Sequence, residues 1–166
     1  MKKLTSLIEV LAFQLDAMYD GEKKIQHQLP TLSKNVDHPK LQEAAAKYVE
    51  HAIEKRSKLK RIFTYLLVPS SKRENLIVDS IFAETGERLN AVSTVSLRDA
   101  VLAACVQTIN HYNIANYTSA LAFAIELNLD AVADLLHEIL AWERETEAAL
   151  QKIVFEGLHQ KSPGAV

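Results

Sequence analysis

The sequence predicts an all-α protein built as a four-helix bundle with one long crossover. Apolar residues recur with a helical period over several long segments. Glycine and proline are scarce, with four of each among 166 residues, which disfavours a loop-rich β fold. This length suits one compact domain with a sizeable core. We therefore expect a single domain over residues 1–166, with its core at about 4–156.

The composition excludes several classes of protein. The 19 basic and 21 acidic residues nearly balance, which argues against a nucleic-acid surface. No apolar run reaches the ~18 residues of a membrane span. The basic and then apolar N-terminus resembles the start of a signal peptide, but Glu9 and Asp16 interrupt it. Cys105 is the only cysteine, so a disulfide framework is excluded and a cytoplasmic location is expected.

The first two predicted helices cover about residues 6–32 and 39–68. A capping box opens the first helix at Ser6, and Pro30 should bend or interrupt it near its end. The stretch "NVDHPK" predicts a turn in which Asp37 caps the second helix, which should stop at proline 69. So short a turn makes the two helices antiparallel neighbours.

The second half of the chain repeats this pattern after a longer connection. Ser71 should open a short third helix that ends near Gly86. Two long helices follow. Ser96 should cap the first of them, at about 96–127, and a tight turn joins it to the second, at about 131–155. The tail 157–166 should be frayed. Two antiparallel pairs joined by a long crossover with a short extra helix form the ferritin-like up-down arrangement.

Two carboxylates fall in the apolar seams of this predicted bundle. Glu22 continues the heptad series of the first helix, and Glu143 that of the last. Tyr48 or His51 and Asn113 lie at nearly the same distance from their turns, so all should meet near mid-bundle. A buried unpaired carboxylate costs several kcal/mol. Two at one level must therefore be protonated, paired, solvated or bound to a cation.

Residues one turn away extend this polar level. Asn110 and Glu147 should lie beside it, whereas His111 points about 200° away from Asn113 around its helix. The stripe of His111, which contains Leu97, Ala104, Thr118 and Ile125, makes the fourth helix apolar on two faces. We expect a dimer contact or the third helix to cover it. His111, Tyr112 and Tyr117 are interpreted as packing or interface residues, Trp142 as core or interface, and Cys105 as core.

Four segments resemble one known family. The stretches "MYDGEKKIQHQLPTLSK", "RDAVLAACVQ", "HYNIANYTSALAFA" and "LLHEILAWERETE" are similar to the YciE/YciF-type stress-protein family over about residues 7–155. The resemblance implies a ferritin-like fold related to the di-iron carboxylate protein rubrerythrin, and a homodimer.

The resemblance also indicates which metal ligands are missing. The family's first-helix Glu matches Glu22, its second-helix His matches Tyr48, and the acid three residues later matches His51. The family's "EHYEIA" is "NHYNIA" here, which places Asn110 and Asn113 at two Glu positions.

In the last helix Glu143 is kept, Trp142 replaces an acid, and Glu147 stands where Asp is usual. A di-iron site takes a Glu-x-x-His from each of two helices, and none lies at this level. Amides are weak ligands beside carboxylates.

Two interpretations of the mid-bundle level follow. In the first, Glu22, His51, Glu143 and Glu147 bind iron or manganese, perhaps as one ion. In the second, which we favour, Glu22 and Glu143 are a buried carboxyl pair hydrogen-bonded to Asn113, Tyr48 and His51. Lys55 could replace the missing cation with its ammonium, but we favour a surface or crossover contact for it.

Three functions are compatible with these patterns. We favour a non-enzymatic, stress-associated ferritin-like protein with a degenerate di-metal site and no firmly assigned cofactor. The second is a metal-dependent oxidoreductase or peroxide-handling protein with a reduced site. The third is a dimeric interaction module with a protein partner that the sequence does not identify. We expect neither nucleic acid nor membrane as a partner.

Overall fold

The structure is a computed structural model that describes residues 3–68 and 73–157. Every regular element in these ranges is helical. The elements are α1 (Leu7–Leu32), the 3-10 turn η1 (Ser33–Asn35), α2 (Pro39–Leu66), α3 (Leu76–Ala91), α4 (Val95–Glu126), α5 (Asp130–Lys152) and the π-helical turn η2 (Ile153–Gly157).

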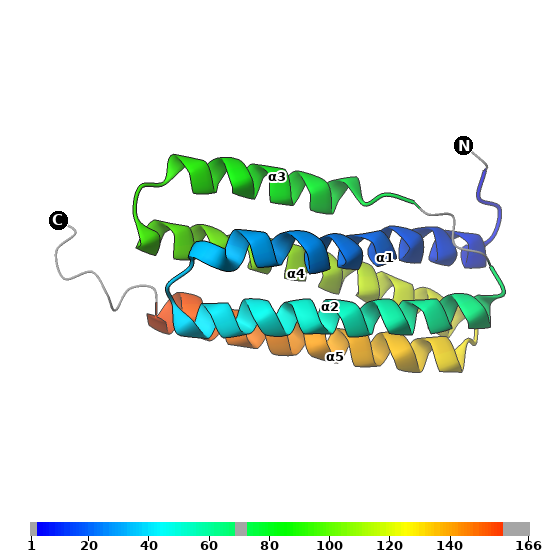
Figure 1. Ribbon diagram of the computed structural model, residues 1–166. Helices are drawn as coiled ribbons and strands as arrows, with labels where there is room; N and C mark the ends of the chain where they lie inside the picture. The colour runs from blue at the N-terminus through cyan, green and yellow to red at the C-terminus, as the bar shows by residue number, and fades with distance from the viewer. Residues whose placement is uncertain (1–2, 69–72, 158–166) are drawn as a thin grey trace.

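The four long helices form the predicted up-down bundle. Figure 1 shows α1 antiparallel to α2 and α4 antiparallel to α5. The two pairs also pack on each other, α1 against α4 and α2 against α5. The crossover between the pairs carries α3, which lies along α1 and α4. The all-α bundle with a short helix in its crossover is thus confirmed. No helix of the described ranges is long and apolar enough to cross a membrane.

The helix starts agree only partly with the predictions. Ser6 caps α1, where its side chain accepts a hydrogen bond from the Glu9 N–H. The predicted cap Asp37 is wrong, because His38 takes this role with Nδ1 3.3 Å from Leu41 N. Thr94 and not Ser96 caps α4. Several side chains of similar capping ability stand in each turn, so the tertiary contacts select one of them.

The helix ends also agree only partly with the predictions. The first helix ends at Leu32 as predicted, and Pro30 lies inside it without interrupting it. Pro30 lacks the N–H that would bond to the carbonyl four residues earlier, so it removes one hydrogen bond of this helix without ending it. Gly86 does not end α3 either, since that helix continues to Ala91. Asn75 caps α3, whereas the predicted cap at Ser71 and the stop at proline 69 lie outside the described residues.

The apolar core has two parts, one at each end of the bundle. One cluster contains Leu11, Leu15, Met18, Leu59, Ile62, Tyr117, Leu136 and Ile139. The other contains Ile25, Leu29, Leu41, Tyr48, Ala52, Leu102, Ile109 and Leu150. Buried polar side chains fill the positions between the two clusters on every long helix. The core is therefore interrupted by a polar layer near its middle.

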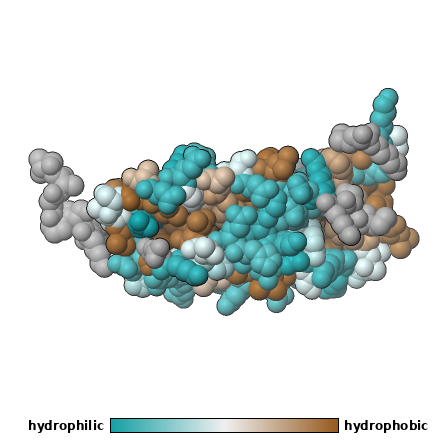
Figure 2. Space-filling model, turned by 45° about the horizontal axis from the view of Figure 1, so that its top comes forward, coloured by the Kyte–Doolittle hydropathy of each residue, from teal (hydrophilic) through white to brown (hydrophobic). Residues whose placement is uncertain are grey.

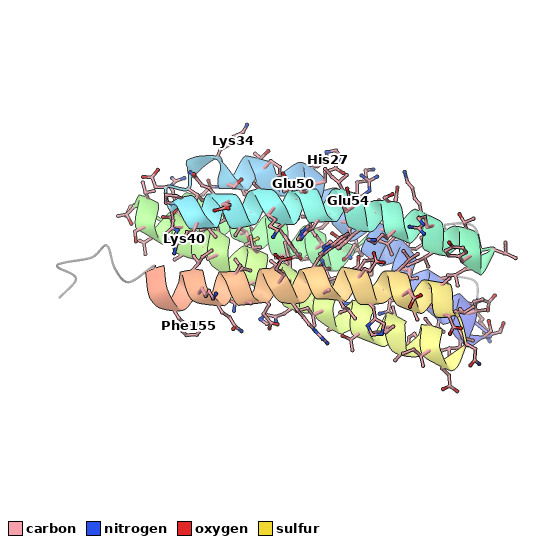
Figure 3. The ribbon with its side chains drawn as sticks, turned by 90° about the horizontal axis from the view of Figure 1, so that it is seen from below. His27, Lys34, Lys40, Glu50, Glu54 and Phe155 are labelled. Carbon is pink, nitrogen blue, oxygen red and sulfur yellow. The ribbon has the colours of Figure 1, made fainter. Side chains whose placement is uncertain are left out.

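The surface of the bundle is mixed. Figure 2 shows hydrophilic residues gathered over the middle of one face, with hydrophobic residues to either side. On α2, Glu50 and Glu54 are exposed (Figure 3), whereas Lys55, the residue after Glu54, is fully buried. The stripe of α4 that holds Leu97, Ala104, His111, Thr118 and Ile125 is exposed. The third helix therefore does not cover this stripe within the chain.

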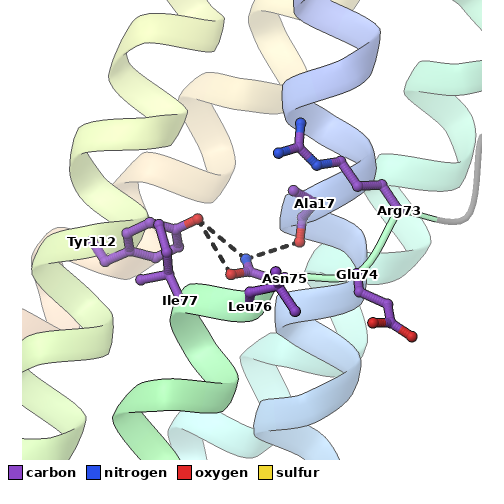
Figure 4. A pocket seen from close by; sticks show the side chains of 7 residues that line it. All are labelled: Ala17, Arg73, Glu74, Asn75, Leu76, Ile77 and Tyr112. Carbon is purple, nitrogen blue, oxygen red and sulfur yellow. Dashed lines mark hydrogen bonds between the residues drawn. The ribbon is translucent and has the colours of Figure 1, made fainter. Parts of the chain in front are cut away.

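Asn75 connects the start of α3 to two helices of the bundle. Its side-chain oxygen accepts from Val78 N–H, and its Nδ2 donates to the Ala17 carbonyl at 2.9 Å and to the Tyr112 hydroxyl at 3.2 Å. Figure 4 shows the bonds to Ala17 and Tyr112 beside a cavity of about 510 Å³. Gly21 on α1 makes this approach possible, because a Cβ there would lie 2.8 Å from Asn75 Nδ2.

We therefore expect Gly21→Ala to lower the free energy of unfolding by a net ~1–2 kcal/mol. When Asn75 is displaced, α3 loses its N-cap and Asn75 loses its buried hydrogen bonds. This loss should exceed the ~1 kcal/mol that alanine gains over glycine in a helix. Gly86→Ala is the matched control, since a Cβ at Gly86 would meet no atom within 4 Å. Urea denaturation should show Gly86→Ala stabilised. Equal stabilisation of both variants would contradict the role of Gly21.

Candidate functional site

The polar layer crosses the bundle between the two apolar clusters. Its side chains come from all four long helices, and each residue is at most 1% exposed. The residues are Glu22 on α1, Tyr48 and Lys55 on α2, Asn110, Asn113 and Tyr117 on α4, and Glu143 on α5. The helical period places each of them in the inward seam of its helix.

Lys55 lies at the centre of the polar layer. Its Nζ is 2.9 Å from Glu22 Oε2 and 2.5 Å from Glu143 Oε1. The same ammonium lies 4.7 Å from the centroid of the Tyr48 ring, in cation–π contact. One ammonium thus connects α1, α2 and α5 through two ion pairs, and the pair with Glu143 is also a charge-assisted hydrogen bond.

Glu143 is the best-satisfied acceptor of the layer. Besides the ammonium of Lys55, it accepts from the Tyr48 hydroxyl at 3.1 Å and from Asn110 Nδ2 at 2.7 Å. Asn113 Nδ2 lies 3.0 Å from Oε1 of Glu143. Asn110 Nδ2 also lies 2.8 Å from the Glu143 backbone carbonyl. The two asparagines therefore act as donors to a carboxylate, which is the opposite of a metal ligand's role.

Glu22 has fewer donors. The Tyr117 hydroxyl donates to its Oε1 at 2.8 Å, and Asn113 Nδ2 lies 3.1 Å from the same oxygen. The two hydrogens of Asn113 Nδ2 are shared among Glu22, Glu143 and the Tyr48 hydroxyl. The Oε2 of Glu22 has the ammonium of Lys55 as its ion-pair partner and no additional hydrogen bond.

The charges of the polar layer do not balance while both carboxylates are ionised. Burial raises the pKa of Glu22, and the charge of Glu143 raises it further. The ammonium of Lys55 and the hydroxyl of Tyr117 lower it again, and the resulting pKa of Glu22 is about 7. A single ammonium neutralises one carboxylate, so the second takes up a proton near neutral pH.

Lys55 and the two tyrosines of the layer keep their ordinary protonation at neutral pH. Burial lowers the pKa of Lys55, but the charges of Glu143 and Glu22 outweigh it and raise the pKa above its usual value. Burial and the same two carboxylates raise the pKa of Tyr48 and Tyr117 well above the usual value. Lys55 is therefore a cation and both tyrosines are neutral.

His51, predicted as a metal ligand or a hydrogen-bond partner, lies outside the polar layer. Its ring stacks on Trp142 of α5, with the ring centroids 5.1 Å apart. Burial and the nearby charge of Lys55 lower the pKa of His51. Its buried Nδ1 has no hydrogen-bond partner among the described residues. The second-helix histidine is thus a half-buried packing residue over the α2–α5 groove.

Glu147, the fourth predicted ligand, also lies outside the polar layer. Its Oε1 is 3.5 Å from His111 Nδ1, and both side chains are partly exposed, at 31% and 51%. His111 therefore faces away from Asn113, as its position on the helix predicts.

The donor set does not fit a di-metal centre. The structure brings Glu22 and Glu143 together, but their oxygens already contact the ammonium of Lys55. The remaining side chains of the layer are amides and tyrosyl hydroxyls, which are poor substitutes for carboxylate and imidazole ligands. Within residues 3–68 and 73–157, no three His, Cys, Asp or Glu side chains form a group that could hold a metal ion.

Sequence reasoning misjudged two residues of the polar layer. The preferred surface contact for Lys55 is wrong, because the side chain is fully buried between two carboxylates. Its heptad position beside Tyr48 and Ile62 indicated the inward direction. Tyr117 is buried as packing would require, but it also donates to Glu22. Its place four residues after Asn113 could have revealed this role.

The fold and the polar layer define a ferritin-like four-helix bundle with an internal charge cluster at mid-bundle. The chain belongs to the family described as "Domain of unknown function (DUF892)", whose model matches residues 6–162. It is 25% identical over 163 residues to Protein YciF of Escherichia coli strain K12, covering 96% of each chain. The predicted resemblance to the YciE/YciF-type family is thereby confirmed.

Solved structures support the fold. The structure of the E. coli stress protein YciF has a TM-score of 0.89 at 22% identity and covers 95% of this chain and 100% of that one. The protein YcfI of Rhodopseudomonas palustris has a TM-score of 0.86 at 23% identity, over 90% of this chain and 96% of that one. At these identities the two structures establish the common architecture of the bundle.

Proposed function

We propose that this protein is a non-enzymatic, stress-associated helical bundle in which an internal salt bridge replaces a di-metal centre. The association with stress rests on the relative named as the stress protein YciF. The observation that carries the proposal is the ammonium of Lys55, which lies 2.9 Å and 2.5 Å from the two buried carboxylates. A cation supplied by the chain itself needs no metal uptake and has no redox chemistry.

The surroundings of the ammonium support a structural role. Asn110, Asn113, Tyr48 and Tyr117 surround the two carboxylates with hydrogen-bond donors. Buried polar groups that are hydrogen-bonded in this way fix one arrangement of the helices, because a shifted register would leave charges unpaired. The polar layer therefore acts as a cross-link among the four long helices. The homodimer stays a prediction, and the exposed stripe of α4 is the surface we propose for it.

Metal analysis tests this proposal. We expect protein purified without chelator to contain iron and manganese far below one ion per chain, measured by plasma mass spectrometry. A chelator should leave the melting temperature unchanged, since only a ligand that binds the folded state stabilises it. Stoichiometric iron or manganese that disappears in Glu22→Ala would overturn the proposal and support a metal-dependent enzyme.

A further inference from the structure

The polar layer has the features of a binding site for a primary ammonium group. Glu22 and Glu143 supply carboxylate oxygens from two helices, and the Tyr48 ring supplies a cation–π face. These are the groups that proteins use to bind ammonium ligands. The nitrogen they surround belongs to Lys55, whose flexible four-carbon stem enters from α2.

Two buried acceptors of the layer have spare capacity. Asn110 Oδ1 is buried and has no hydrogen-bond partner in the described part of the chain, although its Nδ2 donates to Glu143. Glu22 Oε2 has the ion pair with Lys55 alone. A buried acceptor without a donor is unfavourable, so Glu22 Oε2 can accept a hydrogen bond from a cation that is free to orient its N–H groups.

We infer that Glu22, Glu143 and Tyr48 form a cation-binding cage of which Lys55 is the tethered occupant, and that the cage binds a free primary alkylammonium once the tether is removed. The inference rests on the proposed function, in which the cation of the native site is an ammonium and not a metal. Lys55→Ala deletes the atoms of n-propylammonium, so this ion has the size and charge of the space left behind. Engineered cavities of buried side chains bind small ligands of matching shape.

The test is chemical rescue of Lys55→Ala. The variant is refolded from urea in the presence or absence of n-propylammonium chloride, so that the ligand has access before the core closes. At about tenfold above its dissociation constant, the amine should raise the melting temperature by about 3–6 °C, with saturation. 1-Propanol, which lacks the charge, and tetramethylammonium, which is too bulky and has no N–H, should give no saturable rise at equal ionic strength.

Matched variants keep the inference falsifiable. If Lys55→Ala does not fold, the double variant Glu22→Gln with Lys55→Ala takes its place. It keeps only one buried carboxylate of the pair, so it should fold and should bind the amine through Glu143. Adding Glu143→Gln removes the remaining charge and should abolish the response. The wild type should not respond, because its cage is filled. The inference would be overturned if the wild type or the triple variant responded to the amine as strongly as Lys55→Ala. It would also be overturned if the melting temperature rose neither in Lys55→Ala nor in Glu22→Gln with Lys55→Ala.

Manganese separates this inference from the proposed function. If Mn²⁺ stabilises Lys55→Ala more than n-propylammonium does, the assigned ligand class is wrong, whereas the proposed function still holds. Stoichiometric metal in the wild type would overturn the proposed function. A saturable response to the amine alone supports the cage.

Discussion

Lys55→Met should lower the free energy of unfolding by about 3–5 kcal/mol at about pH 8, because it leaves two buried carboxylates without their cation. Methionine has nearly the length and volume of lysine, so the packing of the α2 seam is kept and the charge is removed. Glu22 and Glu143 must then take up protons or remain as uncompensated charges in an apolar core. Urea denaturation followed by circular dichroism measures the change.

A control on the same helix separates this effect from the general loss of a lysine. Lys47 also pairs with α5, through Glu145 at 2.5 Å, but the two side chains are 52% and 55% exposed. Lys47→Met should therefore change the free energy of unfolding by about 1 kcal/mol at most. Equal losses for Lys47→Met and Lys55→Met would contradict a buried ion cluster.

Removing all three charges together should restore most of the lost stability. In Glu22→Gln, Lys55→Met and Glu143→Gln combined, no buried charge remains, and replacing buried ion pairs with neutral groups is often neutral or stabilising. The triple variant should be more stable than Lys55→Met alone. If it is less stable, the carboxylates have a structural role that does not depend on the ammonium.

Wild-type stability should fall between about pH 4.5 and pH 7 by about 3 kcal/mol relative to Glu22→Gln. The pKa of Glu22 rises from 4.5 to about 7 in the folded protein, chiefly because the side chain is buried. A carboxyl group with a raised pKa stabilises the fold while it is protonated, and this contribution is lost as the pH rises through its folded value. Glutamine stays neutral throughout and cannot contribute such a slope.

Glu145→Gln provides the control for this pH dependence. The Lys47 ammonium lowers the pKa of the exposed Glu145, so its small contribution is complete above its unfolded pKa and is lost only at more acidic pH. Between about pH 5.5 and pH 8 this variant should parallel the wild type. Parallel curves for the wild type and Glu22→Gln would instead show that Glu22 titrates in its ordinary range.

Helical periodicity predicted that four side chains of the polar layer point inward to one level. Glu22, Tyr48, Asn113 and Glu143 were placed at one level because each lies in an apolar seam at a similar distance from a turn. The structure confirms their convergence, with Asn113 Nδ2 within 3.1 Å of the other three side chains. The inclusion of His51 as a hydrogen-bond partner is wrong, because His51 shares the height of Tyr48 but stacks on Trp142 outside the inward seam.

Helix boundaries were less predictable for a local reason. Three neighbouring residues at the start of α4, including Thr94 and Ser96, can form a cap, and their intrinsic energies differ by only a few tenths of a kcal/mol. At α3, Asn75 is selected by contacts with Ala17 and Tyr112 that are distant in sequence. Such contacts cannot be read from the local pattern.

The sequence by itself determined the all-α bundle, its antiparallel pairs and the two carboxylates at mid-bundle, because periodicity and turn spacing are local properties of the chain. Only the tertiary structure decided how those carboxylates are neutralised. Lysine can extend to the surface or remain buried, and its choice depends on the charges that other helices bring within about 3 Å of its ammonium. Since Glu22 and Glu143 come from α1 and α5, Lys55 meets them only after the bundle has assembled.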